Sequence, residues 1–349
     1  MSIAVIALAI LWLALIAYAV LGGADFGAGI WDLFAVGSQR QRHRRLINQA
    51  IGPVWEANHV WLIFLIVGLF SVFPAAFAAL TIALFIPLSI ALIGIVLRGA
   101  AFIFRTYELN ESSRSANIWS RVFSTTSLIT PFFLGTSAAA VASGRLVAPD
   151  GVAQADLGSA WLSPFALTIG TMAVALCASL AATYLTQEAS AHGEMDLAHV
   201  YRRRALTTGA LTALLGLLGL LLSPQEAPLL WGGMLARALP VVIATMLIGL
   251  AAAALLFWRR YALARAMVIL ETAFLLGSWG LSQYPYIIPP HLTIANSAND
   301  PNVILALVIA IAVGMALLLP SLYYLFSVFK STASVPGVVH PPEQTPEHS

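Results

Sequence analysis

Long apolar runs recur along the whole chain and limit what it can fold into more than any other feature. A helix that crosses a bilayer needs about 20 apolar residues, and lipid permits only helices or closed barrels. The runs are unbroken rather than alternating, which favours helices. We therefore predict an all-α, polytopic membrane protein with about nine transmembrane helices. The predicted spans are residues 8–36, 46–70, 75–98, 119–143, 161–185, 205–223, 235–257, 266–288 and 302–328.

Composition agrees with that class, because 60% of the 349 residues are hydrophobic and only 9% are charged. We expect one transmembrane domain over residues 1–330, followed by a proline-rich, polar tail over residues 331–349 that is disordered in the cytoplasm. The net charge of +2 comes without any nucleic-acid motif, so we expect no nucleic-acid partner. The single cysteine, Cys177, excludes an intramolecular disulfide.

Basic residues are spread unevenly between the predicted spans. Loops rich in Lys and Arg stay in the cytoplasm by the positive-inside rule. Of the 17 basic residues, all but Arg145 and Arg237 fall on one side of the nine-span arrangement. We therefore expect the amino terminus outside and the carboxyl terminus in the cytoplasm. The residues on the cytoplasmic side are Arg40, Arg42, Arg44, Arg45, Arg98, Arg105, Arg114, Arg121, Arg202, Arg203, Arg204, Arg259, Arg260, Arg265 and Lys330.

Two acidic residues, one in each of the first two predicted spans, lie deep in an antiparallel hairpin around the basic turn at 40–45. Asp25 precedes that turn by about 12 residues and Glu56 follows it by about 10, so at ~1.5 Å per residue both lie roughly 15–18 Å deep. The segment YAVLGGADFGAG also places glycines around Asp25, and small residues four apart let another helix come close. The predicted helix-packing residues are Gly22, Gly23, Gly27, Gly29 and Gly52.

A carboxylate at that depth costs about 2.5–3.5 kcal/mol, so it needs a proton, a partner or water. Three interpretations stay open. Asp25, Glu56 and His59 relay protons from the cytoplasmic side, or they form a structural hydrogen-bonded network. In the third, His59 is a haem or metal ligand, although one histidine beside one glutamate is a weak pattern. The chain has no cysteine motif for an iron-sulfur cluster and no zinc spacing.

Five segments together resemble subunit II of the bd-type quinol oxidases, respiratory complexes that oxidise membrane quinols and reduce dioxygen to water. They follow the family's order and cover most of the chain, and GPVWEANHVWL is the most specific of the motifs. The segments are YAVLGGADFGAG, AIGPVWEANHVWLIF, LRGAAFIFR at 97–105, ATYLTQEA at 182–189 and QYPYIIPPHLTIANSAND at 283–300.

The resemblance implies two four-helix bundles plus one peripheral helix, in a bacterial inner membrane. It implies a heterodimer with a larger subunit I that carries two b-type haems, one d-type haem and the quinol-oxidising loop. This chain would then carry no cofactor, would not be catalytic alone, and would support subunit I while adding acids to a cytoplasmic proton path. Oxygen reduction would draw protons from the cytoplasm and quinol oxidation would release them outside. A small accessory subunit is left open.

At the level of residues, Asp25 matches the second aspartate of the family's signature, and Glu56 stands where the family carries Asp or Glu. Gly22 and Ile103 stand where the family carries acids, so the roles of those acids are not carried over. Two other functions stay open. One is a secondary transporter whose buried acids bind a coupling proton or cation. The other is a purely structural assembly subunit.

Overall fold

The computed structural model describes residues 2–35, 39–107, 114–146 and 158–332. It has two compact units, Met1–Asn299 and Asp300–Ser349, and each is described by itself. Most of the predicted tail, residues 333–349, lies outside the described residues. The helices of the first unit are α1 (Ile3–Leu33), α2 (Arg40–Val72), α3 (Pro74–Ala83), α4 (Phe85–Tyr107), α5 (Arg114–Ser143), α6 (Pro164–Ala191), α7 (Met195–Glu226), α8 (Pro228–Gly233), η1 (Met234–Ala238), α9 (Leu239–Phe257), α10 (Tyr261–Gln283) and α11 (Ile294–Ser297).

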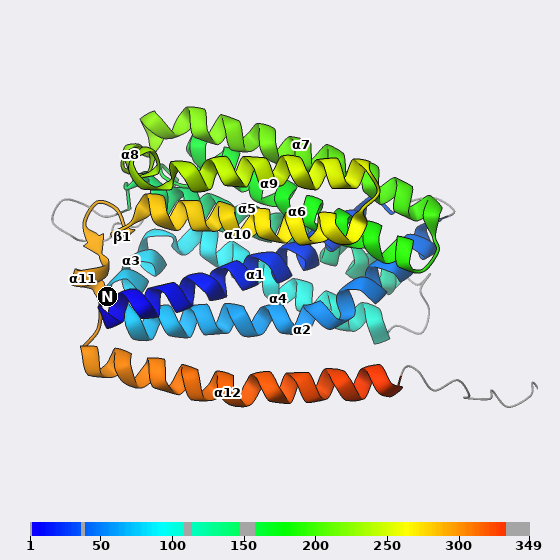
Figure 1. The fold of residues 1–349 in the computed structure, drawn as a ribbon, viewed down its shortest axis with the longest axis horizontal. Coiled ribbons are helices and arrows are strands. Elements are labelled where there is room, and N and C mark those ends of the chain that lie inside the picture. The colour runs from blue at the N-terminus through cyan, green and yellow to red at the C-terminus, as the bar shows by residue number, and fades with distance from the viewer. Residues whose placement is uncertain (1, 36–38, 108–113, 147–157, 333–349) are drawn as a thin grey trace, which may run out of the picture. The chain divides into compact units, whose positions relative to one another are not determined.

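The long helices of the first unit lie alongside one another (Figure 1). Helices α6, α7, α9 and α10 form one group, in which each helix contacts the next and α10 returns to α6. Helices α1, α2, α4 and α5 form the other group, in which α1 contacts α2 and α5, and α5 contacts α4. Contacts of α6 with α1 and α5 join the two groups. The second unit is one helix, α12 (Pro301–Thr332).

Each predicted apolar run corresponds to a helix, and the prediction of an all-α polytopic membrane protein is confirmed. Seven helices in the described chain are long and apolar enough to cross a membrane, and a bent pair counted as one span makes eight. The bent pair is Asn58–Val72 with Pro74–Ala83. The last predicted span falls on α12, whose apolar part at Pro301–Leu317 is shorter than those seven.

Two predicted spans are not single helices over their whole length in the structure. The run 75–98 is not one helix, because α3 ends at Ala83 and α4 begins at Phe85 and continues to Tyr107. Helices α2 and α3 meet at an angle of 117° around Phe73, just before Pro74. Proline lacks a backbone N–H and disfavours helical geometry in the residue before it, so α2 cannot continue. The predicted span 266–288 is helical only as far as Gln283, where α10 ends.

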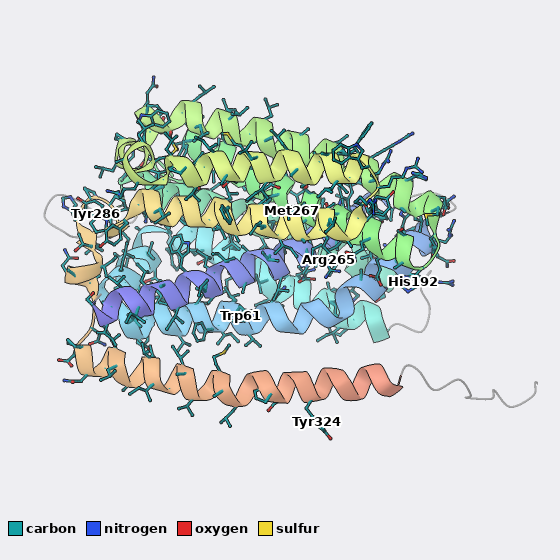
Figure 2. All side chains as sticks on the ribbon, viewed as in Figure 1. Trp61, His192, Arg265, Met267, Tyr286 and Tyr324 are labelled. Carbon is teal, nitrogen blue, oxygen red and sulfur yellow. The ribbon has the colours of Figure 1, made fainter. Side chains whose placement is uncertain are left out.

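After α10 the chain forms a small antiparallel hairpin, β1 (Tyr286–Ile288) and β2 (Leu292–Thr293). The Arg237 guanidinium donates to the carbonyl oxygens of Leu281, Ser282 and Tyr284 and so satisfies the end of α10. Beyond the hairpin, Asn299 donates to the carbonyl oxygens of Ser71 and Val72 at the bent end of α2. Figure 2 shows Tyr286 in this hairpin at the end of the bundle opposite to His192.

Candidate functional site

Asp25 is fully buried in α1 and forms an ion pair with Arg98 of α4. Two guanidinium nitrogens of Arg98 each lie 2.6 Å from a carboxylate oxygen of Asp25, and one of them also donates to the Asp25 backbone oxygen at 2.9 Å. The Asn58 side-chain amide donates to the same carboxylate at 2.7 Å, which brings α2 to the site. Charge-assisted, two-pronged bonds of this kind are short and directional.

Arg98 is as buried as its partner, with 2% of its side chain exposed. Its Nε donates to the Ser127 hydroxyl at 2.8 Å, and its guanidinium stacks on the rings of Phe26 and Phe123 at 5.0 and 4.6 Å. Four hydrogen bonds thus hold the guanidinium, three to Asp25 and one to Ser127. Arg98 was expected among the basic residues at the cytoplasmic ends of the predicted spans, but it lies buried within α4. Its place in the apolar run LIGIVLRGAAFIF was the signal of a buried partner.

The other predicted proton-path residues come from α2. His59 directly follows Asn58 and is partly buried. The backbone of Glu56 belongs to α2, but the side chain of Glu56 and the surroundings of Gly52 lie outside the described part of the chain. The relay or network of Asp25, Glu56 and His59 therefore stays a prediction, and the described partners of Asp25 are Arg98 and Asn58.

The glycines around Asp25 differ in what surrounds them. A Cβ added to Gly27 would overlap the Cys177 carbonyl of α6, and one added to Gly23 would lie 2.8 Å from Leu180 of the same helix. A Cβ on Gly29 would overlap the Ser127 hydroxyl of α5. Gly22 instead faces side chains of its own helix at 3.4 Å or more. Close approach of α1 to α6 and α5 thus depends on three of the four glycines.

One residue before its end, α1 carries a second buried acid, Asp32, for which the sequence alone predicts no role. The carboxylate of Asp32 accepts from Arg44 Nε at 3.0 Å and from the Ser124 hydroxyl at 3.2 Å. Its side chain is fully buried, whereas the side chain of Arg44 is 19% exposed. Asp25 and Asp32 are seven residues apart, so both lie on one face of α1.

The basic turn that begins α2 carries further polar contacts ahead of the predicted span 46–70. Arg42 forms ion pairs with Glu194 and Asp196 at 3.0 and 2.7 Å. His43 shares a hydrogen bond of 3.0 Å with the Tyr201 hydroxyl. Burial, with the Arg204 and Arg42 charges, lowers the pKa of His43 below its ordinary value. These contacts join the start of α2 to the start of α7.

The described residues offer few candidate ligands for a haem or a metal. No group of three or more His, Cys, Asp or Glu side chains gathers there to hold a metal ion. His43 is bound to Tyr201, and the His192 ring lies 2.9 Å from the Glu188 carbonyl beside the turn after α6. Haem iron is held by a side chain such as histidine, methionine, cysteine or tyrosine. In the described span of α2, Asn58–Val72, His59 is the only histidine.

Comparisons with known proteins agree with the fold and the motifs. Residues 3–329 match the family described as cytochrome bd terminal oxidase subunit II. The putative cytochrome bd menaquinol oxidase subunit II of Bacillus subtilis is 24% identical over 93% of this chain and 95% of its own length. Subunit 2 of the cytochrome bd-I ubiquinol oxidase of Escherichia coli K12 is 27% identical over 49% of this chain and 45% of its own.

A solved structure shares the whole architecture. A chain of the bd oxidase from Geobacillus thermodenitrificans matches with a TM-score of 0.77 and 27% sequence identity, over 94% of this chain and 99% of that one. The family match covers nearly the full length, and the matched structure has the same order of helices along that length. The resemblance found in the motifs is confirmed, and the chain belongs to the family of cytochrome bd terminal oxidase subunit II.

Proposed function

We propose that this chain is the non-haem, supporting subunit of a bd-type quinol:oxygen oxidoreductase and takes part in proton uptake from the cytoplasm. Family membership and the names of the relatives, which are subunits of menaquinol and ubiquinol oxidases, support the respiratory assignment. The partner is a haem-bearing subunit I, and the pair forms a heterodimer in the bacterial inner membrane. The basic residues support an outside amino terminus and a cytoplasmic carboxyl terminus.

The observation that carries the proton-uptake role is the buried, bonded Asp25. An apolar environment is an expensive place for two charges, and a buried ion pair is often no more stable than apolar residues in its place. The Asp25–Arg98 pair lies on α1 and α4, and Asn58 links it to the α2 segment that carries Glu56 and His59. In this proposal those acids receive protons from the cytoplasm, while the partner subunit's oxygen chemistry consumes them. Quinol oxidation releases protons on the other side.

Haems b and d belong to subunit I in this proposal. When bound there they supply electron transfer and oxygen reduction, and this chain's residues supply protons and packing. The chain purified alone should then show no Soret absorption band. A haem that stays with the isolated chain, and that is lost in His59→Ala, would contradict the assignment.

The direct test compares Glu56→Gln with the wild-type complex. Glutamine keeps the size and hydrogen bonding of Glu56 but cannot be ionised. Assembly and haem content should persist, while quinol-driven oxygen consumption falls by about 10²-fold if no other donor exists. Asp25→Asn alone is a poorer test, because it leaves the buried Arg98 charge without its partner. Full turnover in a well-assembled Glu56→Gln complex would leave the acids as structural elements only.

A further inference from the structure

A row of polar side chains runs between α1 and α5. On α1 it consists of Asp25, Gly29 and Asp32, which are four and three residues apart and share one side of the helix. On α5 it consists of Ser124 and Ser127, one turn apart. Ser124 bonds to Asp32, and Ser127 accepts from Arg98, the partner of Asp25.

Gly29 has no side chain and so lets α1 and α5 approach closely between the Asp32–Ser124 and Arg98–Ser127 hydrogen bonds. The space that its side chain would fill holds the Ser127 hydroxyl and the Phe123 ring. The face therefore joins two ion pairs, Asp32–Arg44 near the end of α1 and Asp25–Arg98 about 10 Å further into the membrane. We call the set formed by Asp25, Gly29, Asp32, Ser124 and Ser127 the α1–α5 seam.

Asp32 is not placed to stabilise its own helix. The carboxyl end of a helix carries partial negative charge, which disfavours a carboxylate there, and Asp32 is the second-last residue of α1. Its side chain is fully buried, and its bonded partner Arg44 reaches the surface. Its charged and titratable neighbours include Arg44 from α2 and Tyr201 from α7, and the Ser124 hydroxyl faces it from α5.

We propose that Asp32 is the group that takes protons from the cytoplasmic water into the seam, and that Ser124 and Ser127 carry them towards Asp25. The proposal deepens the proton-uptake role and rests on it. A proton from water binds a carboxylate oxygen of Asp32 when the Arg44 side chain moves towards solvent. The carboxylic acid then donates this proton to the Ser124 oxygen, and Ser124 releases its own hydroxyl proton inward.

Ser127 repeats the exchange, since a hydroxyl group can accept one proton and donate another. Side chains three residues apart on a helix have Cβ atoms about 5–6 Å from each other, a gap that one water molecule bridges. Each step breaks one O–H bond and forms another. One proton leaves the water and one reaches the Asp25 region. Asp32 is then ionised again, and each serine hydroxyl regains its first orientation by rotating about its Cβ–Oγ bond.

The test uses the complete oxidase complex, with turnover expressed per haem. Asp32→Asn keeps a side chain able to bond with Ser124 but cannot be protonated, and it should lower oxygen consumption by about 10²-fold if no other route exists. Ser124→Ala leaves the Asp32–Arg44 pair in place and should also slow turnover. Acetate, a small weak acid, should partly restore the activity of Asp32→Asn, whereas a folding defect would not respond to it.

Two matched variants serve as controls. Asp196→Asn removes another aspartate that pairs with an arginine of α2, but this one is exposed and bonds to no residue of α5. Thr126→Ala removes a hydroxyl of α5 that bonds only to carbonyls of its own helix. Both variants should keep wild-type turnover and the wild-type response to acetate.

The outcomes separate this proposal from the proton-uptake role itself. If Glu56→Gln slows turnover but assembled Asp32→Asn and Ser124→Ala do not, the seam is overturned and the proton-uptake role stands. If all three variants keep full turnover, both fail. If Asp32→Asn does not assemble, Ser124→Ala decides, and its full turnover overturns the seam.

Discussion

At the scale of single residues, the Asp25–Arg98 pair is the strongest constraint in the first helix group. Both side chains are almost completely shielded from water, and both carboxylate oxygens of Asp25 are bonded. Such a pair adds little stability compared with apolar residues, but removing one partner leaves a buried charge and costs about 3–5 kcal/mol. Replacing one residue of the pair should therefore destabilise the protein more than replacing both residues together.

We predict that Asp25→Asn and Arg98→Gln each destabilise the protein by about 3–5 kcal/mol, because each leaves the other charge unpaired. The double variant should be more stable than Arg98→Gln alone, since two neutral amides can bond to each other. Thermal unfolding midpoints and the yield of assembled complex measure this effect.

The exposed Arg42–Asp196 pair provides the control for that experiment. Water and salt screen exposed pairs, so Arg42→Gln should lower the unfolding midpoint far less than Arg98→Gln does. Equal losses in Arg42→Gln and Arg98→Gln would contradict the buried-pair argument.

His43 gives a prediction about pH. Its pKa in the folded protein is lowered, first by burial and then by the Arg204 and Arg42 charges. Between that lowered pKa and about 6.5, the unfolded chain binds more protons than the folded one, so stability falls as the pH drops. The wild-type protein should therefore lose more stability from about pH 7.5 to about pH 5.5 than His43→Gln does. Unfolding midpoints at the two pH values test this, and equal losses would contradict it.

At the scale of helices, α1 is positioned by the small residues on its faces. Gly27 packs against the α6 backbone at Cys177, while Gly22 meets only side chains of α1. Gly27→Ala should thus cost about 1–3 kcal/mol through overpacking. Gly22→Ala should be neutral or slightly stabilising, because alanine favours a helix by up to ~1 kcal/mol. Unfolding midpoints of the two variants compare them directly, and similar values would argue against close packing of α1 on α6.

Hydrophobic runs predict where helices lie, but they do not predict where helices break. The sequence predicts two spans within residues 46–98, namely 46–70 and 75–98, and it gives no sign of a break at Leu84, which is as apolar as its neighbours. The structure has three helices there, with the sharp bend just before Pro74. The proline was the visible signal of that bend. The partner that completes it, Asn299, is more than 200 residues away and has no local signature.

At the scale of the whole molecule, the sequence predicted the membrane class and the burial of Asp25, but it missed the partner of Asp25. Counting charges for orientation treats every arginine as a loop residue, and that rule hid Arg98. It also left Asp32 unassigned, because its contacts with Arg44 and Ser124 come from two other helices. Pairings between helices depend on packing, which periodicity along one helix does not encode.

The orientation of the whole molecule is testable with single cysteines in a Cys177→Ala background. Ser115 lies exposed at the start of α5, where Arg114 is the first residue, and Ala191 lies exposed at the end of α6. Ala295 lies exposed beside the hairpin, whereas its neighbour Ser297 is buried. In intact cells, an impermeant thiol reagent should label Ala295→Cys and leave Ser115→Cys and Ala191→Cys unlabelled. The opposite pattern would invert the orientation and the direction of proton uptake.

The distance along the chain between Asp25 and Arg98 has a consequence for how the protein is made. The two residues are 73 positions apart, and a ribosome adding about 5–20 residues per second needs roughly 4–15 s to cover that distance. During this interval α1 reaches the translocation machinery with an aspartate whose counter-charge has not been synthesised. The apolar residues of α1 must by themselves offset the insertion cost of this aspartate, about 2.5–3.5 kcal/mol. The hydrophobicity of the first helix is therefore a requirement of biosynthesis as well as of the finished fold.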